Sequence, residues 1–360
     1  MPKILFIGTH RLNRSPSQRF RFEQYLYFLE QHGINYEISP LLSEKDDLIY
    51  YSKGNYLKKI EILIKSFNKR NKDALSAYHY DIIFIQREAF VVGPAYFERL
   101  LKKTGKKIIF DFDDAIWLKN VSEANKRFAW IKFPSKISNI ISLSDVVIAG
   151  NDYLANYASK YNSNIKVIPT TIDTNYHKRS ITPERKNQVC IGWTGSHTTI
   201  QYLDYLIPTL KKIKRKYGDK IYFKIIGDSN FSNEELGIQG VKWNLSDEID
   251  QLSEIDIGIM PLPENNWTLG KCGLKGLQYM ALEIPTILSS VGENCKIITD
   301  GVNGFLAKSE NEWIDKLSFL IESPDIRRDM GIKARKTVED YYSVNSQKEN
   351  YIRIFKELLK

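Results

Sequence analysis

The chain has 360 residues, of which 42% are hydrophobic, 12% aromatic and 26% charged. These proportions are ordinary for folded globular proteins, and they exclude a disordered, collagen-like or coiled-coil chain. The length exceeds what one hydrophobic core usually organises, which predicts two domains.

The net charge of +9 is concentrated in two short segments. Residues 53–72 hold seven lysines and arginines against one glutamate, and residues 11–21 hold four arginines and no acid. A protein that coats nucleic acid spreads its cations over a long surface. The pattern therefore predicts two discrete sites for anionic partners, and no nucleic-acid partner.

The three cysteines, Cys190, Cys272 and Cys295, are scattered and odd in number. This usage is typical of a reducing compartment and argues against a disulfide framework. No stretch reaches the ~18 apolar residues of a membrane span, and the N-terminus lacks the pattern of a signal peptide. We expect a cytoplasmic protein with no spanning helix.

Short apolar runs alternate with amphipathic stretches along the first half of the chain. The predicted elements are, in order, strand 3–8, helix 17–32, strand 34–39, helix 55–76, strand 81–86, helix 94–104, strand 106–111, strand 145–149, helix 151–160 and strand 165–168. Runs such as DIIFI and KKIIF have no period-two alternation, which favours parallel strands covered on both faces. Residues 1–170 are therefore predicted to form a doubly wound, Rossmann-like domain.

Residues 171–188 are polar and without apolar period, and we interpret them as a linker. The alternation then restarts with strand 189–195, helix 199–217, strands 221–227, 239–243 and 256–260, helix 271–283, strand 285–290 and helices 309–322 and 325–341. Residues 189–340 thus form a second Rossmann-like domain, and residues 341–360 a C-terminal helix returning toward the first. In this α/β class the two parallel sheets face a central cleft, where ligands of open sheets bind.

A glycine- and lysine-rich turn precedes the predicted helix 271–283. Glycines such as Gly273 let the backbone approach a ligand, the helix start attracts an anion, and Lys271 and Lys275 add positive charge. Gly292 lies in a second turn after the next strand. The two turns suit a diphosphate, although packing glycines and solvated lysines on a surface helix are the alternative.

The chain resembles a known family in several segments. GKCGLKGLQYMALEIPTILSSVGEN, DGVNGFLAKSENEW and MGIKARKTVEDYYS are similar to the donor-domain signature of group 1 (family 4) glycosyltransferases of the GT-B fold. PSQRFRFEQYLYFLEQHGI, KIIFDFDDAIW, AGNDYLANYA and VIPTTID resemble a bacterial surface-polysaccharide subgroup. The resemblance implies transfer of a sugar from a nucleotide diphosphate sugar, held by the C-terminal domain, to a glycan or lipid-linked acceptor held by the N-terminal domain. It implies no further cofactor and no metal.

Two features of the family pattern are absent. Its pair of glutamates spaced eight apart would fall on Gly270 and Gln278, and its Arg and Lys near the first donor-domain helix are missing from WTGSHTTIQYL. Lys271 and Lys275 are then the replacements that neutralise the departing diphosphate, with Lys271 as a catalytic candidate. Gln278 and Asn294 are expected to touch ribose or sugar.

Strand ends of the second domain complete the expected donor site. Gly195 ends strand 189–195. Asp228 and Trp243 also follow strands, where backbone groups and an aromatic ring could receive a nucleobase. Packing is the alternative for Trp243.

Acidic residues end a strand of the first domain in FDFDDAIW. Asp113 is the candidate to orient or deprotonate an acceptor hydroxyl, together with His10 in the turn after the first strand. A structural role is the alternative for His10. A divalent metal at Asp111 and Asp113 is a weaker reading, because it belongs to a different glycosyltransferase fold. Helix capping by Asp113 or Asp114 is the other alternative.

Three arginines are candidates for acceptor binding: Arg19 and Arg21, near a predicted helix start, and Arg87, at a strand end beside Glu88. A cation near a helix start is repelled by the positive end of the helix dipole, and an anionic ligand would offset this repulsion at Arg19 and Arg21. Surface ion pairs are the alternative.

Residues 53–72 combine an apolar stripe with excess lysine, which fits contact with an anionic membrane surface. A core-facing helix with a solvated cationic back is the alternative. A membrane contact would make the protein peripheral on the inner face of the cytoplasmic membrane. The functional rivals are a hydrolysing nucleotide-sugar epimerase and a non-catalytic carbohydrate- or membrane-binding protein.

Overall fold

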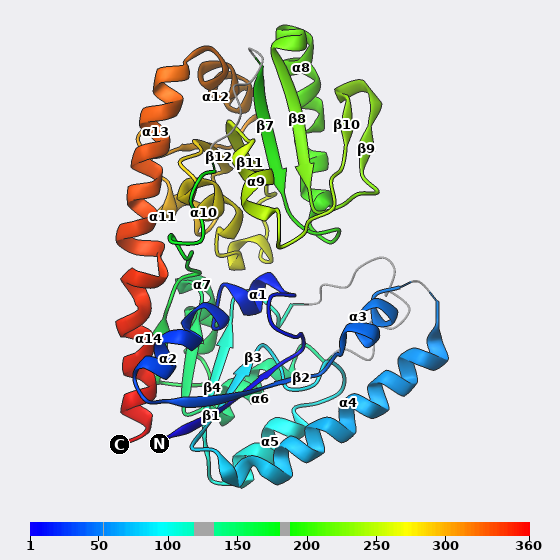
Figure 1. Cartoon of the computed structure of the whole chain (residues 1–360), viewed down its shortest axis with the longest axis vertical. Coiled ribbons are helices and arrows are strands. Elements are labelled where there is room, and N and C mark those ends of the chain that lie inside the picture. The colour runs from blue at the N-terminus through cyan, green and yellow to red at the C-terminus, as the bar shows by residue number, and fades with distance from the viewer. Residues whose placement is uncertain (53, 119–132, 181–187) are drawn as a thin grey trace. The chain divides into compact units, whose positions relative to one another are not determined.

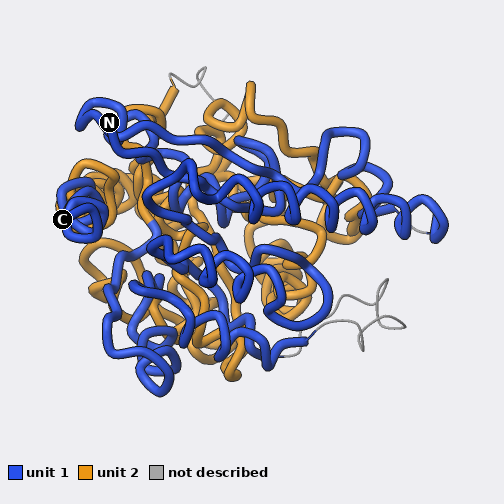
Figure 2. The backbone as a smooth tube through the Cα atoms, turned by 90° about the horizontal axis from the view of Figure 1, so that it is seen from below, with its two compact units in different colours: residues 1–170, 347–360 blue, residues 171–346 orange. Residues whose placement is uncertain are grey.

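The computed structural model describes every residue except 53, 119–132 and 181–187. The described chain divides into two compact units (Figure 2): unit 1, residues 1–170 and 347–360, and unit 2, residues 171–346. Each unit is a parallel sheet flanked by helices (Figure 1). The predicted fold class of two Rossmann-like α/β domains is confirmed, whereas the cleft between them stays a prediction.

The sheet of unit 1 has six parallel strands in the order β2-β1-β3-β4-β5-β6. They are β1 Lys3–Gly8, β2 Asn35–Pro40, β3 Ile82–Gln86, β4 Lys107–Phe112, β5 Val146–Ala149 and β6 Ile165–Val167. The central strands are buried along almost their whole length, as their unbroken apolar runs predict. The strand order reverses between β1 and β3, and ligands of such sheets bind at the carboxyl ends beside this point.

The helices of unit 1 include a final one contributed by the end of the chain. They are α1 Pro16–Arg19, α2 Leu26–Gln31, α3 Glu44–Tyr50, α4 Tyr56–Ser76, α5 Tyr96–Lys103, α6 Lys136–Leu143, α7 Asp152–Ala158 and α14 Val344–Leu358, which belongs to unit 1 from residue 347 onward. On α14, the ring of Tyr351 stacks on Tyr25 with centroids 4.2 Å apart. Phe355 packs near Phe6 and Phe84 in the same core.

The sheet of unit 2 has five parallel strands in the order β13-β12-β11-β7-β8. They are β7 Val189–Thr194, β8 Ile221–Ile226, β11 Ile257–Met260, β12 Thr286–Ser289 and β13 Phe305–Ala307, and a separate antiparallel pair is formed by β9 Ser232–Asn233 and β10 Ile238–Gln239. The helices are α8 Ile207–Tyr217, α9 Glu248–Ser253, α10 Leu274–Ala281, α11 Asn294–Ile297, α12 Glu310–Glu322 and α13 Pro324–Thr337. The order reverses between β7 and β11, which places this unit's expected ligand site at their carboxyl ends.

The helix predicted over residues 17–32 is broken. It consists of α1, a 3-10 turn at Glu23–Tyr25, and α2. Phe20, Arg21 and Phe22 are all buried. Three consecutive residues span about 200° around a regular helix, so one face could not bury them all.

Other predicted elements also differ from the structure. Helix 199–217 is a 3-10 turn at Ile200–Tyr205 followed by α8, and of the predicted strand 239–243 only Val241 pairs with β8, through a single bridge to Ile226. Helices α3, α6 and α9 were not predicted. Of the predicted linker, residues 171–180 are part of unit 2, where Ile172 bridges to Ser343, and residues 181–187 lie outside the described residues.

Candidate functional sites in the two units

The start of α10 and the turn after β12 lie against each other in unit 2. Gly273 has φ of +68°, and a Cβ there would come within 2.2 Å of Ile297 and 3.6 Å of the Asn294 side chain. Gly292 has φ of +54°, and its Cβ would lie 3.1 Å from the carbonyl oxygen of Leu269. Only glycine suits both positions, because neighbouring protein atoms fill the space that a side chain would need, and the two turns pack closely together.

The two lysines predicted to bind diphosphate sit over aromatic rings. The ammonium of Lys275 lies 4.3 Å from the ring centroid of Trp193, and that of Lys271 lies 5.2 Å from the centroid of Trp267. Burial, and the neighbouring charge of Lys271, lower the pKa of Lys275 to about 7. No carboxylate of the described residues offsets this effect, so the site favours an added anion.

A buried carboxylate that sequence reasoning missed holds two of the predicted donor residues. Glu248 Oε1 accepts hydrogen bonds from Trp243 Nε1 at 3.1 Å and from Gln278 Nε2 at 3.3 Å. Trp243 also packs on a hydrophobic cluster that includes Ile226 and Leu252, as the packing alternative had it. Nε1 of Trp243 and Nε2 of Gln278 are therefore directed toward the buried carboxylate of Glu248.

Asn294 likewise supports the turn that carries it. It is 1% exposed, and its side-chain amide donates to the carbonyl oxygen of Ser289 at 3.0 Å. Close by, a cavity of about 520 Å³ opens at the carboxyl ends of β11, β12 and β13, and Pro261, Ser290 and Trp313 are among its lining residues.

Gly195 begins a tight loop after β7. A Cβ on Gly195 would lie 2.3 Å from the ring of Trp193, and a Cβ on Gly227 would lie 1.7 Å from the carbonyl oxygen of Gly195. The loop also carries His197, which no sequence motif indicated. His197 pairs with Asp228, and the nucleobase contact expected at this strand end stays a prediction.

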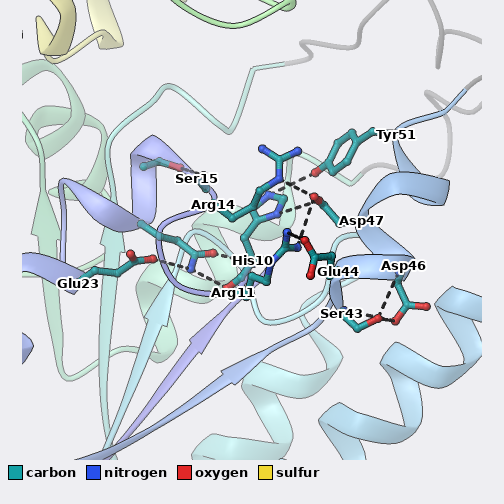
Figure 3. A network of polar contacts seen from close by, with 12 residues as sticks. His10, Arg11, Arg14, Ser15, Glu23, Ser43, Glu44, Asp46, Asp47 and Tyr51 are labelled. Atoms are coloured by element: carbon teal, nitrogen blue, oxygen red, sulfur yellow. Dashed lines mark hydrogen bonds and ion pairs between the residues drawn. The ribbon is translucent and has the colours of Figure 1, made fainter. Parts of the chain in front are cut away.

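In unit 1, His10 belongs to a polar network at the carboxyl ends of β1 and β2 (Figure 3). Its ring stacks on Tyr51, whose hydroxyl lies 3.3 Å from His10 Nε2, and His10 Nδ1 lies 3.5 Å from Asp47. Arg14 Nε donates to Asp47 at 2.5 Å. Although burial opposes it, these contacts lower the pKa of the Asp47 carboxyl.

Two further groups fix this network. Gln18 accepts a hydrogen bond from the backbone amide of His10 at 2.7 Å and donates to its carbonyl oxygen at 2.8 Å. Asp47 comes from α3, whose capping box joins Ser43 and Asp46. That S-x-x-D pattern is the sequence signal that could have located α3 and hence Asp47.

Arg87 joins the predicted catalytic Asp113 to Asp114. Its Nε donates to Asp113 at 2.9 Å and its Nη2 donates to Asp114 at 2.5 Å. Burial raises the pKa of Asp113 against the opposing charge of Arg87. The chain after Asp114 forms turns as far as Leu118, so the described residues contain no helix there for either aspartate to cap.

Arg21 already has an acidic partner within unit 1, which corrects its prediction as an acceptor-binding residue. It is 2% exposed, and its Nη2 donates to Asp111 at 2.6 Å while its Nη1 donates to the carbonyl oxygen of Ile168 at 2.6 Å. Arg19 is half-buried, and its guanidinium lies 5.0 Å from the ring centroid of Phe20. The charge of Arg21 is therefore neutralised by Asp111, a residue of β4.

Among the described residues, no three histidine, cysteine or acidic side chains gather as metal ligands. Within the same residues, no helix is both long and apolar enough to cross a bilayer.

Known proteins resemble this chain in part of its sequence and in the whole of its fold. Residues 188–323 match the model of the family described as glycosyl transferases group 1. Trehalose synthase from Pyrococcus horikoshii is 29% identical over 154 residues, which cover 43% of this chain and 32% of that protein. The chain thus spans about a third of the length of this curated relative.

Three solved structures align with nearly the full chain. Sucrose-phosphate synthase from Thermosynechococcus elongatus has a TM-score of 0.72 at 14% identity, covering 99% of both chains. A glycosyltransferase from Rickettsia africae has a TM-score of 0.70 at 17% identity, covering 100% of this chain and 99% of that one. Anabaena HepE, solved with UDP and glucose, has a TM-score of 0.65 at 15% identity, covering 99% and 100%. At these identities the likeness shows the fold alone. The chain therefore has the GT-B fold, and its residues 188–323 match the group 1 glycosyltransferase family that its motifs predict.

Proposed function

We propose that the protein is a glycosyltransferase that moves a sugar from a nucleoside diphosphate sugar bound by unit 2 to an acceptor bound by unit 1. The observation that carries this proposal is the pair Lys271 and Lys275 at the start of α10. Lys275 is a half-buried cation with a pKa of about 7 and no offsetting carboxylate among the described residues. A diphosphate would supply the missing negative charge, and HepE, which shares the fold, was solved with UDP.

In the proposed reaction, the bond between the sugar and the diphosphate breaks as positive charge develops on the sugar ring. Lys271, Lys275 and the backbone near Gly273 and Gly292 stabilise the departing diphosphate. A preorganised site of this kind needs no solvent rearrangement when the charge appears.

On the acceptor side, the hydroxyl group of a sugar must lose its proton. His10, held between Asp47 and Tyr51, is the proposed proton acceptor, and Asp113, held by Arg87, orients the hydroxyl. Arg14 pairs with Asp47, and Arg87 pairs with both Asp113 and Asp114. Because these arginines already have acidic partners, the network suits an uncharged, hydroxyl-rich glycan.

Purified protein with labelled nucleotide sugars and a panel of glycan acceptors separates this function from its rivals. A product that requires acceptor supports a transferase. An epimerised sugar without acceptor would indicate the hydrolysing epimerase, and binding without turnover would indicate a carbohydrate-binding protein.

We further propose that the acceptor is carried on a membrane lipid, as in surface-polysaccharide assembly, and that α4 rests on the inner face of the cytoplasmic membrane. The buried face of α4 consists of Ile62, Ser66 and Arg70, and Arg70 donates to the carbonyl oxygens of Gly8 at 2.7 Å and Ser39 at 3.0 Å. The fully buried residues of α4 therefore lie outside the apolar stripe.

Part of the apolar stripe, which consists of Leu57, Ile60, Leu63, Ile64 and Phe67, faces solvent, whereas the ring of Phe67 packs on Phe97 with centroids 4.9 Å apart. Leu57 is 84% exposed, Ile60 is 53% exposed and Ile64 is 59% exposed. Their spacing of three and four residues places them on one side of the helix. The same helix carries Lys58, Lys59, Lys65, Lys69 and Lys72, of which Lys65 pairs with Asp46. Exposed apolar side chains flanked by cations match the chemistry of an anionic lipid surface.

The protein is expected to pellet with phosphatidylglycerol vesicles, to stay in solution with neutral vesicles, and to be released as salt rises toward ~0.5 M. Each lysine near the surface contributes on the order of 1 kcal/mol. Co-sedimentation measures the effect. Replacing Lys58, Lys59, Lys65 and Lys69 by Glu should abolish pelleting while nucleotide binding remains.

A matched control applies the same charge change to exposed lysines of other elements: Lys160, Lys178, Lys333 and Lys356. This variant should still pellet. If the wild type ignores anionic vesicles at low salt, α4 is a solvated surface and the acceptor is not held through it.

Turnover is expected to survive EDTA, because lysines and backbone amides are proposed to stabilise the leaving group. The measurement is the initial rate with and without chelator. A complete loss that manganese or magnesium restores would instead assign a metal to the neighbourhood of Asp111 and Asp113.

A further inference from the structure

An aspartate–histidine pair lies at the carboxyl ends of β7 and β8. Nδ1 of His197 lies 2.7 Å from Oδ2 of Asp228. The His197 side chain is 81% exposed, whereas that of Asp228 is 7% exposed. The other carboxylate oxygen, Oδ1, accepts a hydrogen bond from the backbone amide of Asn230 at 3.0 Å. A buried, anchored carboxylate thus orients an imidazole that is almost wholly in solvent.

This arrangement leaves one ring nitrogen for a ligand. An ionised Asp228 accepts the hydrogen of Nδ1, so Nε2 is directed away from the carboxylate. Nε2 contacts no other group in the part of the chain that the structure describes. A surface histidine without such a support would sample several rotamers, and this one is held in a single orientation.

Backbone hydrogen bonds fix the loop that carries His197. The amide of Gly195 donates to Ile226 at 3.0 Å, and that of Ser196 donates to the Thr199 hydroxyl at 3.0 Å. The next two backbone amides, of His197 and Thr198, donate to no group among the described residues. Two amides and an imidazole therefore lie within one short turn, a combination that suits an anion.

Trp193 connects this loop to the lysine site. A Cβ on Gly195 would lie 2.3 Å from the Trp193 ring, and the ammonium of Lys275 lies 4.3 Å from the centroid of the same indole. The loop and the start of α10, both in unit 2, thus lie against the same aromatic side chain. This shared neighbour is the basis for assigning both elements to one diphosphate site.

We propose that His197, positioned by Asp228, is a further donor-binding residue whose Nε2 contacts the diphosphate of the nucleoside diphosphate sugar. The inference rests on the proposed function, because it assumes that Lys271 and Lys275 bind this diphosphate. His197 supplies a donor from the loop after β7, in addition to the lysines of α10. Asp228 acts through His197 and touches no ligand.

The test measures binding of UDP, GDP, dTDP and the corresponding monophosphates by calorimetry, with His197→Ala, His197→Gln, Asp228→Asn and the control His79→Ala. His79 is an exposed histidine of unit 1. For the diphosphate that the wild type binds, His197→Ala should weaken binding about tenfold, and the monophosphate should lose less. His79→Ala should change nothing.

The other two variants separate positioning from contact. His197→Gln keeps an N–H donor and should recover part of the lost affinity. Asp228→Asn should give an intermediate loss, and combined with His197→Ala it should cause no further loss, because Asp228 acts only through the imidazole.

The outcomes also separate this inference from the function on which it rests. If the wild type binds a diphosphate and His197→Ala binds it equally well, His197 is not a donor-binding residue, although the transferase proposal stands. If the wild type binds none of the nucleoside diphosphates, both proposals are overturned. Equal losses for diphosphate and monophosphate would overturn the assignment to the diphosphate.

Discussion

Replacing Arg21 with methionine is expected to lower the free energy of unfolding by about 3–5 kcal/mol. The side chains of Arg21 and Asp111 are 1% and 0% exposed, so the variant leaves a buried carboxylate without its counter-charge. It also removes the hydrogen bond to the carbonyl oxygen of Ile168. Chemical denaturation of the purified protein, followed by tryptophan fluorescence and circular dichroism, measures the change.

Two further variants show that the lost pair is the cause. Arg99→Met, at an exposed position of the same unit, should stay within about 0.5 kcal/mol of the wild type. The double variant Arg21→Met with Asp111→Leu should recover much of the loss, since no buried charge remains. A small effect of Arg21→Met alone would contradict the account of a buried ion pair.

Replacing both Lys271 and Lys275 with alanine is expected to weaken nucleoside diphosphate binding about 100-fold or more. Each lysine offers a charge-assisted contact of about 1.5–3 kcal/mol, and tenfold in affinity corresponds to about 1.4 kcal/mol. Calorimetry gives the affinities. Lys336→Ala, which removes one cation paired with Asp340, is the control and should bind normally. Unchanged affinity in a double variant that melts normally would exclude the lysine site.

The pH dependence of binding gives a second readout for Lys275. With a pKa of about 7, Lys275 is largely neutral at pH 8 in the unliganded protein, whereas a bound diphosphate favours the ammonium. Binding should therefore take up a proton, and affinity should fall as pH rises from 7 to 9 in a range where the diphosphate is already ionised. Lys275→Ala should lose this dependence. Calorimetry in buffers of different ionisation enthalpy counts the protons.

The strands were predictable because their apolar runs are local. IIFIQ in β3 and KIIFDF in β4 are buried as the sequence indicates, and Gly273 in the α10 turn stands where the chain needs positive φ. The break at Phe20–Phe22 was not predictable from helical periodicity. It depends on Asp111, which lies 90 residues farther along and pairs with Arg21.

The site residues were likewise predictable where they lie in one continuous segment and not where they come from distant parts of the chain. The lysine-bearing turn is a continuous segment, so its composition shows its anion-binding character. His197 and Asp228 are 31 residues apart, in the loops that follow β7 and β8, and no sequence motif links the two. Glu248 and Asp47 contact their partners through α9 and α3, two short helices whose apolar patterns are too brief to be recognised.

Completion of unit 1 has a consequence for how the chain is made in the cell. The helix α14 supplies Tyr351 and Phe355 to the core of unit 1, although residues 171–346 of unit 2 precede it in synthesis. At ordinary ribosomal rates these intervening residues take about 10–35 s to emerge. During that time the growing chain exposes the apolar surface around Tyr25 and Phe84, which is where chaperones would bind. Unit 2 can fold first, so the part of the protein that is translated earlier is the one that matures later.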